Sequence, residues 1–374
     1  MRILYVADDL YPGFGGQARA TEGHMAALAQ RGHEVTAIAG REAHGTEPPS
    51  GVRVVRMPSL RLGGAQTRVA YPILGTLAAE VSRADVLHAN TPAVLTAAAV
   101  LLAGRRHVPV VLGVHTQIET STLQLPSLAR PLTRGLLAWY GWLFGRADLL
   151  VAPTAFAAAT SRGFTDVRVE VVSNGVDYAA YSALERAPGP ERRLLYVGRL
   201  SAEKRPTDLL ELARLLPTDC QLTVAGTGPL AAELAHGVER AGLAGRVRLA
   251  GYVDEEEKRR LLADADVFVM PSPAELQSIA TLEAMAAGCA VVAFDYASSA
   301  VPQLVEEAAG GVVVPPADPV AQAAAVTALL EDGGRLRELQ LNAREYARTQ
   351  DVSNSARRLE ELYLEALSAR RGWS

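Results

Sequence analysis

Two glutamates in the second half of the chain, Glu275 and Glu283, are the side chains best placed to bind a polyhydroxylated ligand. In the run MPSPAELQSIATLEAMAAG, a strand is expected to end at Pro271 and a helix to begin around residues 277–280. Glu275 then precedes the helix and can accept hydrogen bonds from sugar hydroxyls, whereas Glu283, one to two turns inside it, can reach a ribose diol. The amides at the start of this helix can bind phosphate groups. They belong to Ser278, Ile279, Ala280 and Thr281.

Paired carboxylates could instead act as the acid and the base of a hydrolase. A helix N-terminus lowers the pKa of a neighbouring carboxyl group, however, and so weakens it as an acid. A second acidic pair, Asp264 and Asp266, has the D-x-D spacing of a metal site. This pair precedes an expected strand and so lies away from the sheet edge where ligands bind. We therefore expect no metal site.

A basic pair follows the first expected strand of the second half. Gly198 leads into Arg199 and Lys204, which are five residues apart and could hold a diphosphate. Lys204 and Lys258 are the only lysines in a chain that otherwise uses arginine, which indicates a chemical requirement at Lys204. Lys258 lies in the run EEEKRR, where we expect a solvated helix face.

Glycines follow other expected strands. Gly226 and Gly228, in VAGTGPL, leave room for a nucleotide base or ribose. Gly15 and Gly16, after the first strand, let backbone amides approach an anionic or sugar ligand. The full G-x-G-x-x-G spacing is absent, which argues against dinucleotide binding. Ordinary turns would also explain these glycines.

Two polar residues complete the candidates from the first half. His115 ends the fifth expected strand in PVVLGVHT, and Asn174 opens the turn NGVD. A histidine at a strand end is more often structural than catalytic, and Asn-Gly forms turns without any ligand. Both residues therefore have a structural interpretation beside the functional one.

Short β-branched runs alternate with longer Ala- and Leu-rich amphipathic runs, and this alternation predicts parallel sheets built from βαβ units. Strands are expected at 2–7, 34–39, 52–56, 85–89, 109–114, 148–152 and 168–172, and then at 193–198, 221–225, 246–250, 266–270, 290–294 and 311–314. The expected fold class is α/β, with two doubly wound domains whose strands end at a common cleft.

A loop rich in Ala, Pro, Gly and charges, at 178–192, sets the expected domain boundary. We expect an N-terminal domain over 1–180 and a C-terminal domain over 181–355. A final helix over 356–374 could pack back on the N-terminal domain.

The composition excludes several classes of protein. With 374 residues, 49% hydrophobic and 21% charged, and a net charge of −4, the chain fits two globular domains better than a disordered or nucleic-acid-binding protein. The longest apolar stretch, 91–104, is shorter than a membrane span. Asp8 and Asp9 stand where a signal peptide needs apolar residues, so we expect a cytoplasmic protein. Cys220 and Cys289 are expected in the core.

In chain order, these residues form a set of motifs: GG-x-x-R, HT, NGVD, GR-x-x-x-x-K, G-x-G-P, and E-x7-E followed by AMAAG. The set resembles the retaining glycosyltransferases of family 4 and spans nearly the whole chain. The resemblance implies the GT-B architecture, with an acceptor-binding N-terminal domain and a C-terminal domain that binds a nucleoside-diphosphate sugar. It also implies catalysis without a metal or a cofactor, the sugar nucleotide being a co-substrate.

The same resemblance implies a role for each candidate residue. Gly15 and Gly16 would lie beside the donor diphosphate, and His115 against the transferred sugar. Arg199 and Lys204 would bind the diphosphate, Glu275 the sugar hydroxyls and Glu283 the ribose. The catalytic residues would thus be His115, Arg199, Lys204 and Glu275. The donor would also contact Asn174, Gly198, Gly226, Gly228, Ser278, Ile279, Ala280 and Thr281.

The chain departs from the family at Gln277 and Ser278, where an aromatic or apolar residue and then a glycine are usual, and this narrows the approach to the sugar. The run ELQSIATLEAMAAG is similar to that of bacterial glycolipid synthases, so the acceptor could be a membrane lipid such as diacylglycerol, a glycolipid or a saccharide.

The segment 123–144 bears on membrane contact. It combines two arginines with four aromatic residues, as an interfacial membrane-binding face could, although core packing of this helix is favoured. These residues are Arg130, Arg134, Trp139, Tyr140, Trp142 and Phe144. Peripheral contact with the inner face of a membrane is the corresponding expectation, and nucleic acid is not an expected partner.

Two other activities fit parts of the pattern. An epimerase acting on a nucleotide sugar would share the paired domains but would convert the donor without an acceptor. A non-catalytic sugar-binding protein could close on its ligand, yet such a protein would normally be exported. For the transferase, the expected donor is a hexose on UDP or GDP, as in UDP-glucose or GDP-mannose.

Overall fold

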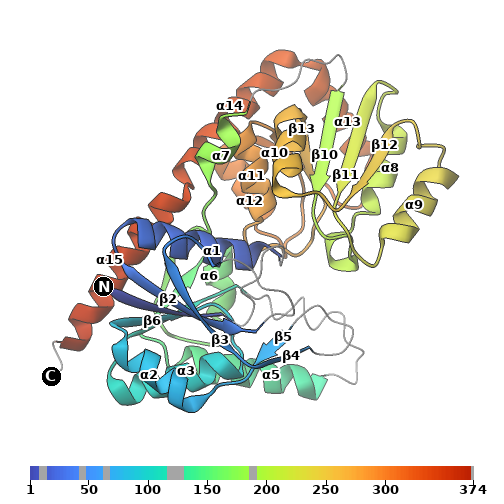
Figure 1. Cartoon of the computed structure of the whole chain (residues 1–374). Coiled ribbons are helices and arrows are strands. Elements are labelled where there is room, and N and C mark those ends of the chain that lie inside the picture. Colours follow the sequence, from blue (N-terminus) through green and yellow to red (C-terminus); the bar gives the residue numbers. More distant parts are fainter. Residues whose placement is uncertain (8–14, 42–47, 62–67, 116–129, 185–191, 372–374) are drawn as a thin grey trace. The chain divides into compact units, whose positions relative to one another are not determined.

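Parallel strands alternate with helices along the described chain and build two α/β units (Figure 1). The structure is a computed structural model that describes residues 1–7, 15–41, 48–61, 68–115, 130–184 and 192–371. Unit 1 comprises Met1–Gly175 together with Val352–Ser374, and unit 2 comprises Val176–Asp351. The expected doubly wound α/β class is confirmed for both units.

The sheet of unit 1 holds seven parallel strands over the described residues, in the order β3-β2-β1-β6-β7-β8-β9. In chain order they are β1 Arg2–Ala7, β2 Glu34–Gly40, β3 Val52–Met57, β6 Val86–Ala89, β7 Val110–Gly113, β8 Leu149–Ala152 and β9 Val169–Val171. Helices α1 (Gly15–Gln30) and α15 (Val352–Arg371) lie on one face, and α2 (Leu74–Arg83) and α3 (Val94–Arg106) on the other. The strand order reverses between β1 and β6, which makes this the switch point of the sheet.

One feature of unit 1 was not expected from the sequence. Strands β4 (Ser59–Arg61) and β5 (Arg68–Ala70) form a small antiparallel sheet. Strands of three residues are too short for an alternation of apolar and polar residues to stand out.

The sheet of unit 2 holds six parallel strands, again counted over the described residues, in the order β12-β11-β10-β13-β14-β15. They are β10 Arg192–Val197, β11 Cys220–Ala225, β12 Val247–Gly251, β13 Val267–Met270, β14 Ala290–Phe294 and β15 Gly311–Val314. Its helices are α7 Tyr178–Ser182, α8 Asp208–Leu215, α9 Ala231–Arg240, α10 Glu255–Asp264, α11 Ile279–Ala287, α12 Val301–Ala308, α13 Pro319–Glu331 and α14 Gly333–Thr349. The switch point lies between β10 and β13.

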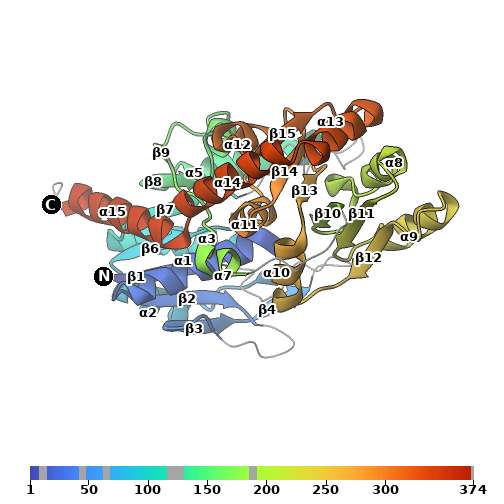
Figure 2. The same ribbon diagram turned by 90° about the horizontal axis from the view of Figure 1, so that it is seen from above.

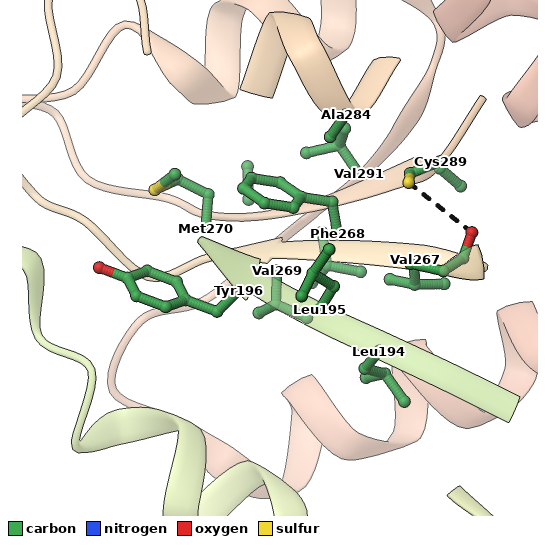
Figure 3. Close-up of a cluster of buried hydrophobic side chains, with 14 of the residues drawn as sticks. Leu194, Leu195, Tyr196, Val267, Phe268, Val269, Met270, Ala284, Cys289 and Val291 are labelled. Atoms are coloured by element: carbon green, nitrogen blue, oxygen red, sulfur yellow. Dashed lines mark hydrogen bonds between the residues drawn. The ribbon is translucent and has the colours of Figure 1, made fainter. Parts of the chain in front are cut away.

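The centre of unit 2 is almost entirely apolar, because helices cover both faces of its sheet. Figure 3 shows this core around β10, β13 and α11, and labels Leu194, Leu195, Tyr196, Val267, Phe268, Val269, Met270, Ala284, Cys289 and Val291. The thiol of Cys289 lies 3.2 Å from the carbonyl oxygen of Leu262. Cys220 is buried as well, so the expectation that both cysteines lie in the core is confirmed.

The chain passes between the units at residues 175/176 and 351/352, and not within the expected loop at 178–192. Val176 forms a parallel bridge with Asp351, and its N–H donates to the carbonyl oxygen of Gln350 at 3.0 Å. Tyr181 of α7 is buried in the core of unit 2. These contacts fix residues 176–182 to unit 2, which moves the boundary ahead of the predicted one after residue 180. The second boundary likewise falls before the predicted 355/356.

Helix α15 is a structural part of unit 1. It runs beside α1 in both views (Figures 1 and 2), and its Tyr363 shares a fully buried apolar cluster with Tyr5 and Leu28. Several ion pairs on its surface also join it to the rest of the unit, among them Arg370 to Asp148 at 2.8 Å and Arg358 to Glu170 at 2.9 Å. Because exposed ion pairs contribute little, the buried cluster holds the helix in place.

Helix α5 (Arg130–Phe144) packs largely into unit 1. Tyr140 and Phe144 are buried, and Trp139 stacks on Trp142 with ring centroids 5.2 Å apart. These contacts are those of core packing, which the sequence favoured over a membrane-binding face.

Residues 123–129, the first part of the segment singled out for membrane contact, lie outside the described residues. Within the described part of the chain, none of the helices combines the length and the apolar character that crossing a bilayer requires.

Candidate active site

The switch point of unit 2 brings two loops together at the carboxyl edge of its sheet. Strands β10 and β13 are adjacent and parallel, so the loop that starts at Gly198 lies next to the loop that starts at Pro271. Doubly wound sheets bind their ligands at this position. Apart from Gly226 and Gly228, which follow the neighbouring β11, every predicted site residue of the second half lies in these two loops or in α11.

Lys204 and Glu275 meet between these two loops. Nζ of Lys204 lies 2.6 Å from Oε1 of Glu275 and 3.3 Å from the carbonyl oxygen of Ala274. The side chains of Lys204 and Glu275 expose only 25% and 13% of their surface. An ammonium group has three N–H donors. Within the described structure, one donor of Lys204 and the second oxygen of Glu275 therefore remain for a ligand.

The side chain of Arg199 is exposed and forms no hydrogen bond or ion pair with a residue that the structure describes, whereas its backbone carbonyl accepts a hydrogen bond from the Tyr196 hydroxyl at 3.1 Å. Its charge acts on Glu203 in the same loop. Burial raises the pKa of Glu203, but hydrogen bonds from Ser201 and from the Glu203 backbone, with the charges of Arg199 and Lys204, outweigh burial, so the pKa lies below its ordinary value. The guanidinium of Arg199 is thus available to an anionic ligand.

The amino end of α11 begins at a strained residue. Ser278 has a φ of +69°, a backbone conformation that favours glycine. Its Oγ accepts a hydrogen bond from the N–H of Thr281 at 3.3 Å and one from the Thr281 hydroxyl at 2.8 Å, and so caps the helix. Gln277 and Ser278 are themselves buried, while Ile279 and Ala280 are partly exposed.

Glu283 of α11 is held by Lys258 of α10. Nζ of Lys258 lies 2.8 Å from each carboxylate oxygen, and both residues are buried. Oε2 of Glu255 at 3.3 Å and the ring of Tyr181 at 5.5 Å also surround the ammonium group. The expectation of a solvated helix face at Lys258 is therefore wrong, because this one side chain of the charged run turns toward α11.

Each lysine of the chain thus pairs with one glutamate of the motif, Lys204 with Glu275 and Lys258 with Glu283. A compact ammonium group can lie between buried carboxylate oxygens where the larger planar guanidinium would need more space. The rarity of lysine was the signal that identified Lys204 in the sequence. The same signal, applied to Lys258, could have identified the second pair.

The glycines after β10 and β11 are required by backbone packing. A Cβ atom at Gly226, whose φ is +142°, would lie 1.8 Å from the carbonyl oxygen of Gly198. One at Gly228 would lie 2.3 Å from the carbonyl oxygen of Leu200. Close approach of the backbone thus explains why these positions are glycines, and room beside them for a base or a ribose stays a prediction. Gly226 and Gly228 let the loop after β11 approach the loop after β10 closely.

The predicted site residues of unit 1 also lie at the carboxyl ends of strands. Gly15 and Gly16 open α1, His115 follows β7, and Asn174, which is buried, follows β9. Asp8 and Asp9, in the segment before α1, lie outside the described residues.

His115 is an uncharged group at neutral pH. Burial, with a smaller contribution from the charge of His24, lowers the pKa of His115 to about 3. A Cβ atom at Gly113 would lie 2.6 Å from Cδ2 of His115 and 2.2 Å from Oδ1 of Asn90. The ring of His115 and the side chain of Asn90 therefore both lie beside Gly113. Sequence reasoning missed Gly113 and Asn90, although the run VLGVHT contains the glycine.

The D-x-D pair has a structural role. Oδ2 of Asp266 accepts a hydrogen bond from the backbone N–H of Arg193 at 2.9 Å, and Asp264 lies 3.9 Å from the Arg193 guanidinium. Among the described residues, no three His, Cys, Asp or Glu side chains lie together as a metal site would require.

Replacing Ser278 by glycine should stabilise the protein. A non-glycine residue in such a conformation costs about 1–3 kcal/mol, whereas exchanging a serine cap for glycine costs only a few tenths. We expect the free energy of unfolding in urea to rise by about 1 kcal/mol. Ser278→Ala is the matched control: it loses the cap and keeps the strain, so it should be less stable than the wild type. A destabilised Ser278→Gly variant would contradict this account.

Replacing Lys258 by methionine should lower the free energy of unfolding by about 3–5 kcal/mol, because it leaves Glu283 buried without its cation. The double variant Lys258→Met/Glu283→Gln should recover much of this loss. Arg260→Met, which breaks an exposed pair with Glu256 in the same helix, should change stability little. Equal effects of Lys258→Met and Arg260→Met would show that the buried pair does not form.

Two family models match the chain, one for each half. "Glycosyltransferase Family 4" matches residues 14–180 and "Glycosyl transferases group 1" matches residues 179–350. A glycogen synthase of Mycobacterium tuberculosis is 30% identical, with 89% of this chain and 86% of that protein covered. A D-inositol 3-phosphate glycosyltransferase of Salinispora tropica is 31% identical, with 86% of this chain and 74% of that protein covered.

Solved structures share the fold. HepE of Anabaena, in complex with UDP and glucose, superposes with a TM-score of 0.77 at 19% identity, covering 98% of this chain and all of that one. Sucrose-phosphate synthase of Thermosynechococcus elongatus gives 0.78 at 20% identity, covering 99% and 100%. The matched domains, the similarity over most of the chain and the shared fold lead to one conclusion: the chain belongs to the family 4 glycosyltransferases of GT-B fold, which act on nucleotide sugars.

Proposed function

We propose that the protein transfers a hexose from a UDP- or GDP-hexose to a hydroxyl acceptor, with retention of anomeric configuration and without a metal ion. The observation that carries this proposal is the set of groups at the switch point of unit 2. The exposed Arg199, the Lys204–Glu275 pair and the amino end of α11 gather at one sheet edge. These groups suit a ligand that combines a diphosphate with a sugar.

The chemistry of the transfer explains why cations are needed there. The bond between the anomeric carbon and the diphosphate oxygen breaks, and its electron pair leaves with the diphosphate. The acceptor oxygen bonds to the anomeric carbon on the same face, and its proton passes to a phosphate oxygen. Negative charge therefore grows on the diphosphate, where Arg199, Lys204 and the α11 amides would stabilise it.

The glutamates and His115 serve the sugar and the ribose in this proposal. Glu275 would accept hydrogen bonds from sugar hydroxyls through the oxygen that Lys204 leaves free, and Glu283, held in place by Lys258, would accept them from the ribose. His115, with its pKa lowered to about 3 by burial, would contact the transferred sugar as a neutral hydrogen-bonding group.

We further propose a lipid or glycolipid hydroxyl as the acceptor, reached at the inner face of a membrane. The similarity of the α11 segment to glycolipid synthases supports it, as do the exposed Arg134 and Leu137 on α5. Liposomes that contain anionic lipid should carry the protein upward in a flotation gradient, and Leu137→Glu should weaken this. Protein that stays entirely in the soluble fraction would contradict the lipid acceptor.

Thermal unfolding with UDP, GDP, ADP or NAD, each with magnesium or with EDTA, tests the donor. One nucleoside diphosphate should raise the unfolding temperature equally in magnesium and EDTA, because a ligand at about 100 times its Kd stabilises the folded state by roughly 2.7 kcal/mol. Lys204→Ala should lower turnover by about 10²–10³-fold. Arg214→Ala, on the exposed face of α8, is the control.

Three results would contradict the proposal. A shift with NAD alone would indicate a different ligand class, and near-normal turnover of Lys204→Ala would remove that residue from the mechanism. Conversion of the sugar nucleotide without any acceptor would indicate an epimerase.

A further inference from the structure

A chain of hydrogen bonds runs through the buried centre of unit 1. The hydroxyl of Tyr5 in β1 lies 3.0 Å from the hydroxyl of Tyr363 in α15, which contacts Nδ1 of His88 in β6. Nε2 of His88 lies 2.9 Å from Oδ1 of Asn90. Asn90 Nδ2 lies 2.8 Å from Oγ1 of Thr21 in α1. All five side chains are buried.

The direction of these hydrogen bonds follows from the last link. The Thr21 hydroxyl donates its one proton to the carbonyl oxygen of Gln17 at 2.9 Å, since a carbonyl can only accept. Thr21 must therefore accept from Asn90 Nδ2, which turns Asn90 Oδ1 toward His88 and places the imidazole proton of His88 on Nε2. The bare Nδ1 then accepts from Tyr363, and Tyr363 accepts from Tyr5.

A neutral His88 is required for this order, and its surroundings keep it neutral. Burial, with the charges of His24 and His115, lowers the pKa of His88 to about 3. The imidazole stacks on the ring of Tyr5, with centroids 4.6 Å apart and planes at 15°, and the ring of Tyr363 meets its edge. His88 is thus held by the rings of Tyr5 and Tyr363 as well as by its two hydrogen bonds.

This series of hydrogen bonds ends at the switch point of unit 1, where substrate-binding groups are expected. Asn90 follows β6, and its backbone carbonyl accepts a hydrogen bond from the Gln17 side chain at 2.9 Å. Gln17 stands directly after Gly16 in the first turn of α1. The Asn90 side chain and the His115 ring lie against the same face of Gly113. Asn90 therefore contacts α1 just after Gly16 and lies beside Gly113 together with His115.

We propose that Tyr363 of the C-terminal helix is a positioning residue for the active site: its hydroxyl fixes His88, His88 fixes the Asn90 carboxamide, and Asn90 fixes His115 and the start of α1. The effect on turnover rests on the proposed function, whereas the coupling to His115 does not. Nothing in the C-terminal helix contacts the reacting atoms under this proposal: its influence passes through the hydrogen bonds as far as Asn90 and from Asn90 to His115 by packing beside Gly113.

Two conservative variants test the proposal. Tyr363→Phe leaves the buried Nδ1 of His88 without its donor, while Tyr5→Phe removes only the terminal donor and leaves every acceptor from Nδ1 onward satisfied. Each variant loses one buried hydroxyl, but Tyr363→Phe leaves both the Tyr5 hydroxyl and Nδ1 of His88 without partners and should lose more stability, so the free energy of unfolding is measured for both variants beside the signals of His115. The imidazole ¹⁵N and ¹³Cε1 signals of His88 and His115 are compared with the wild type. His88→Gln and His115→Gln variants assign these signals.

The His115 signals should shift in Tyr363→Phe and stay in place in Tyr5→Phe. Turnover of Tyr363→Phe should fall by about threefold to tenfold with the Kd of the nucleoside diphosphate unchanged, and that of Tyr5→Phe should stay within about twofold. Unshifted His115 signals in Tyr363→Phe, or equal changes in both variants, would overturn the proposal. A wild-type protein that transfers no sugar would instead contradict the proposed function, and the His115 signals would still decide the coupling.

Discussion

The order of the parallel strands determines where the candidate site residues of each unit lie. In each sheet the first strand lies in the interior and the chain builds outward to one side before it returns to the other. Two neighbouring strands at the point of return therefore end side by side at the same edge, where folds of this kind bind their ligands. In unit 2 the loops after β10 and β13 meet at this edge through Lys204 and Glu275, and in unit 1 the start of α1 meets Asn90.

The charged side chains at the switch point of unit 2 are mostly paired, so the site is not simply positive. Two glutamates that are suited to hydroxyl groups each have an ammonium partner, 2.6 Å from Glu275 and 2.8 Å from Glu283. Arg199 stands outside these pairs. A diphosphate bound as proposed would therefore meet one cation without a carboxylate partner in the described structure and a second, Lys204, that is shared with Glu275.

The sequence was sufficient for the sheets, because buried parallel strands appear as short apolar runs between amphipathic helices. All thirteen expected strands occur, most of them within one residue of the predicted bounds. The sequence was not sufficient to predict which side chains of different elements pair with each other. Lys258 has charged neighbours in the chain and a buried partner 25 residues away. Asn90 and Tyr363 carry no local pattern that links them to His88. Such contacts depend on which helix face meets which strand.

The discontinuity of unit 1 has a consequence for how the protein is made. Unit 2 is one continuous stretch, so all of its core is synthesised before α15. Unit 1 begins to emerge first but lacks α15, whose Leu359, Leu362 and Tyr363 fill its central cluster. The unit that is synthesised first therefore cannot complete its core until α15 has been added. Until then, the apolar face that α1 and β1 present to α15 stays uncovered, and it is the surface that a chaperone would need to shield during synthesis.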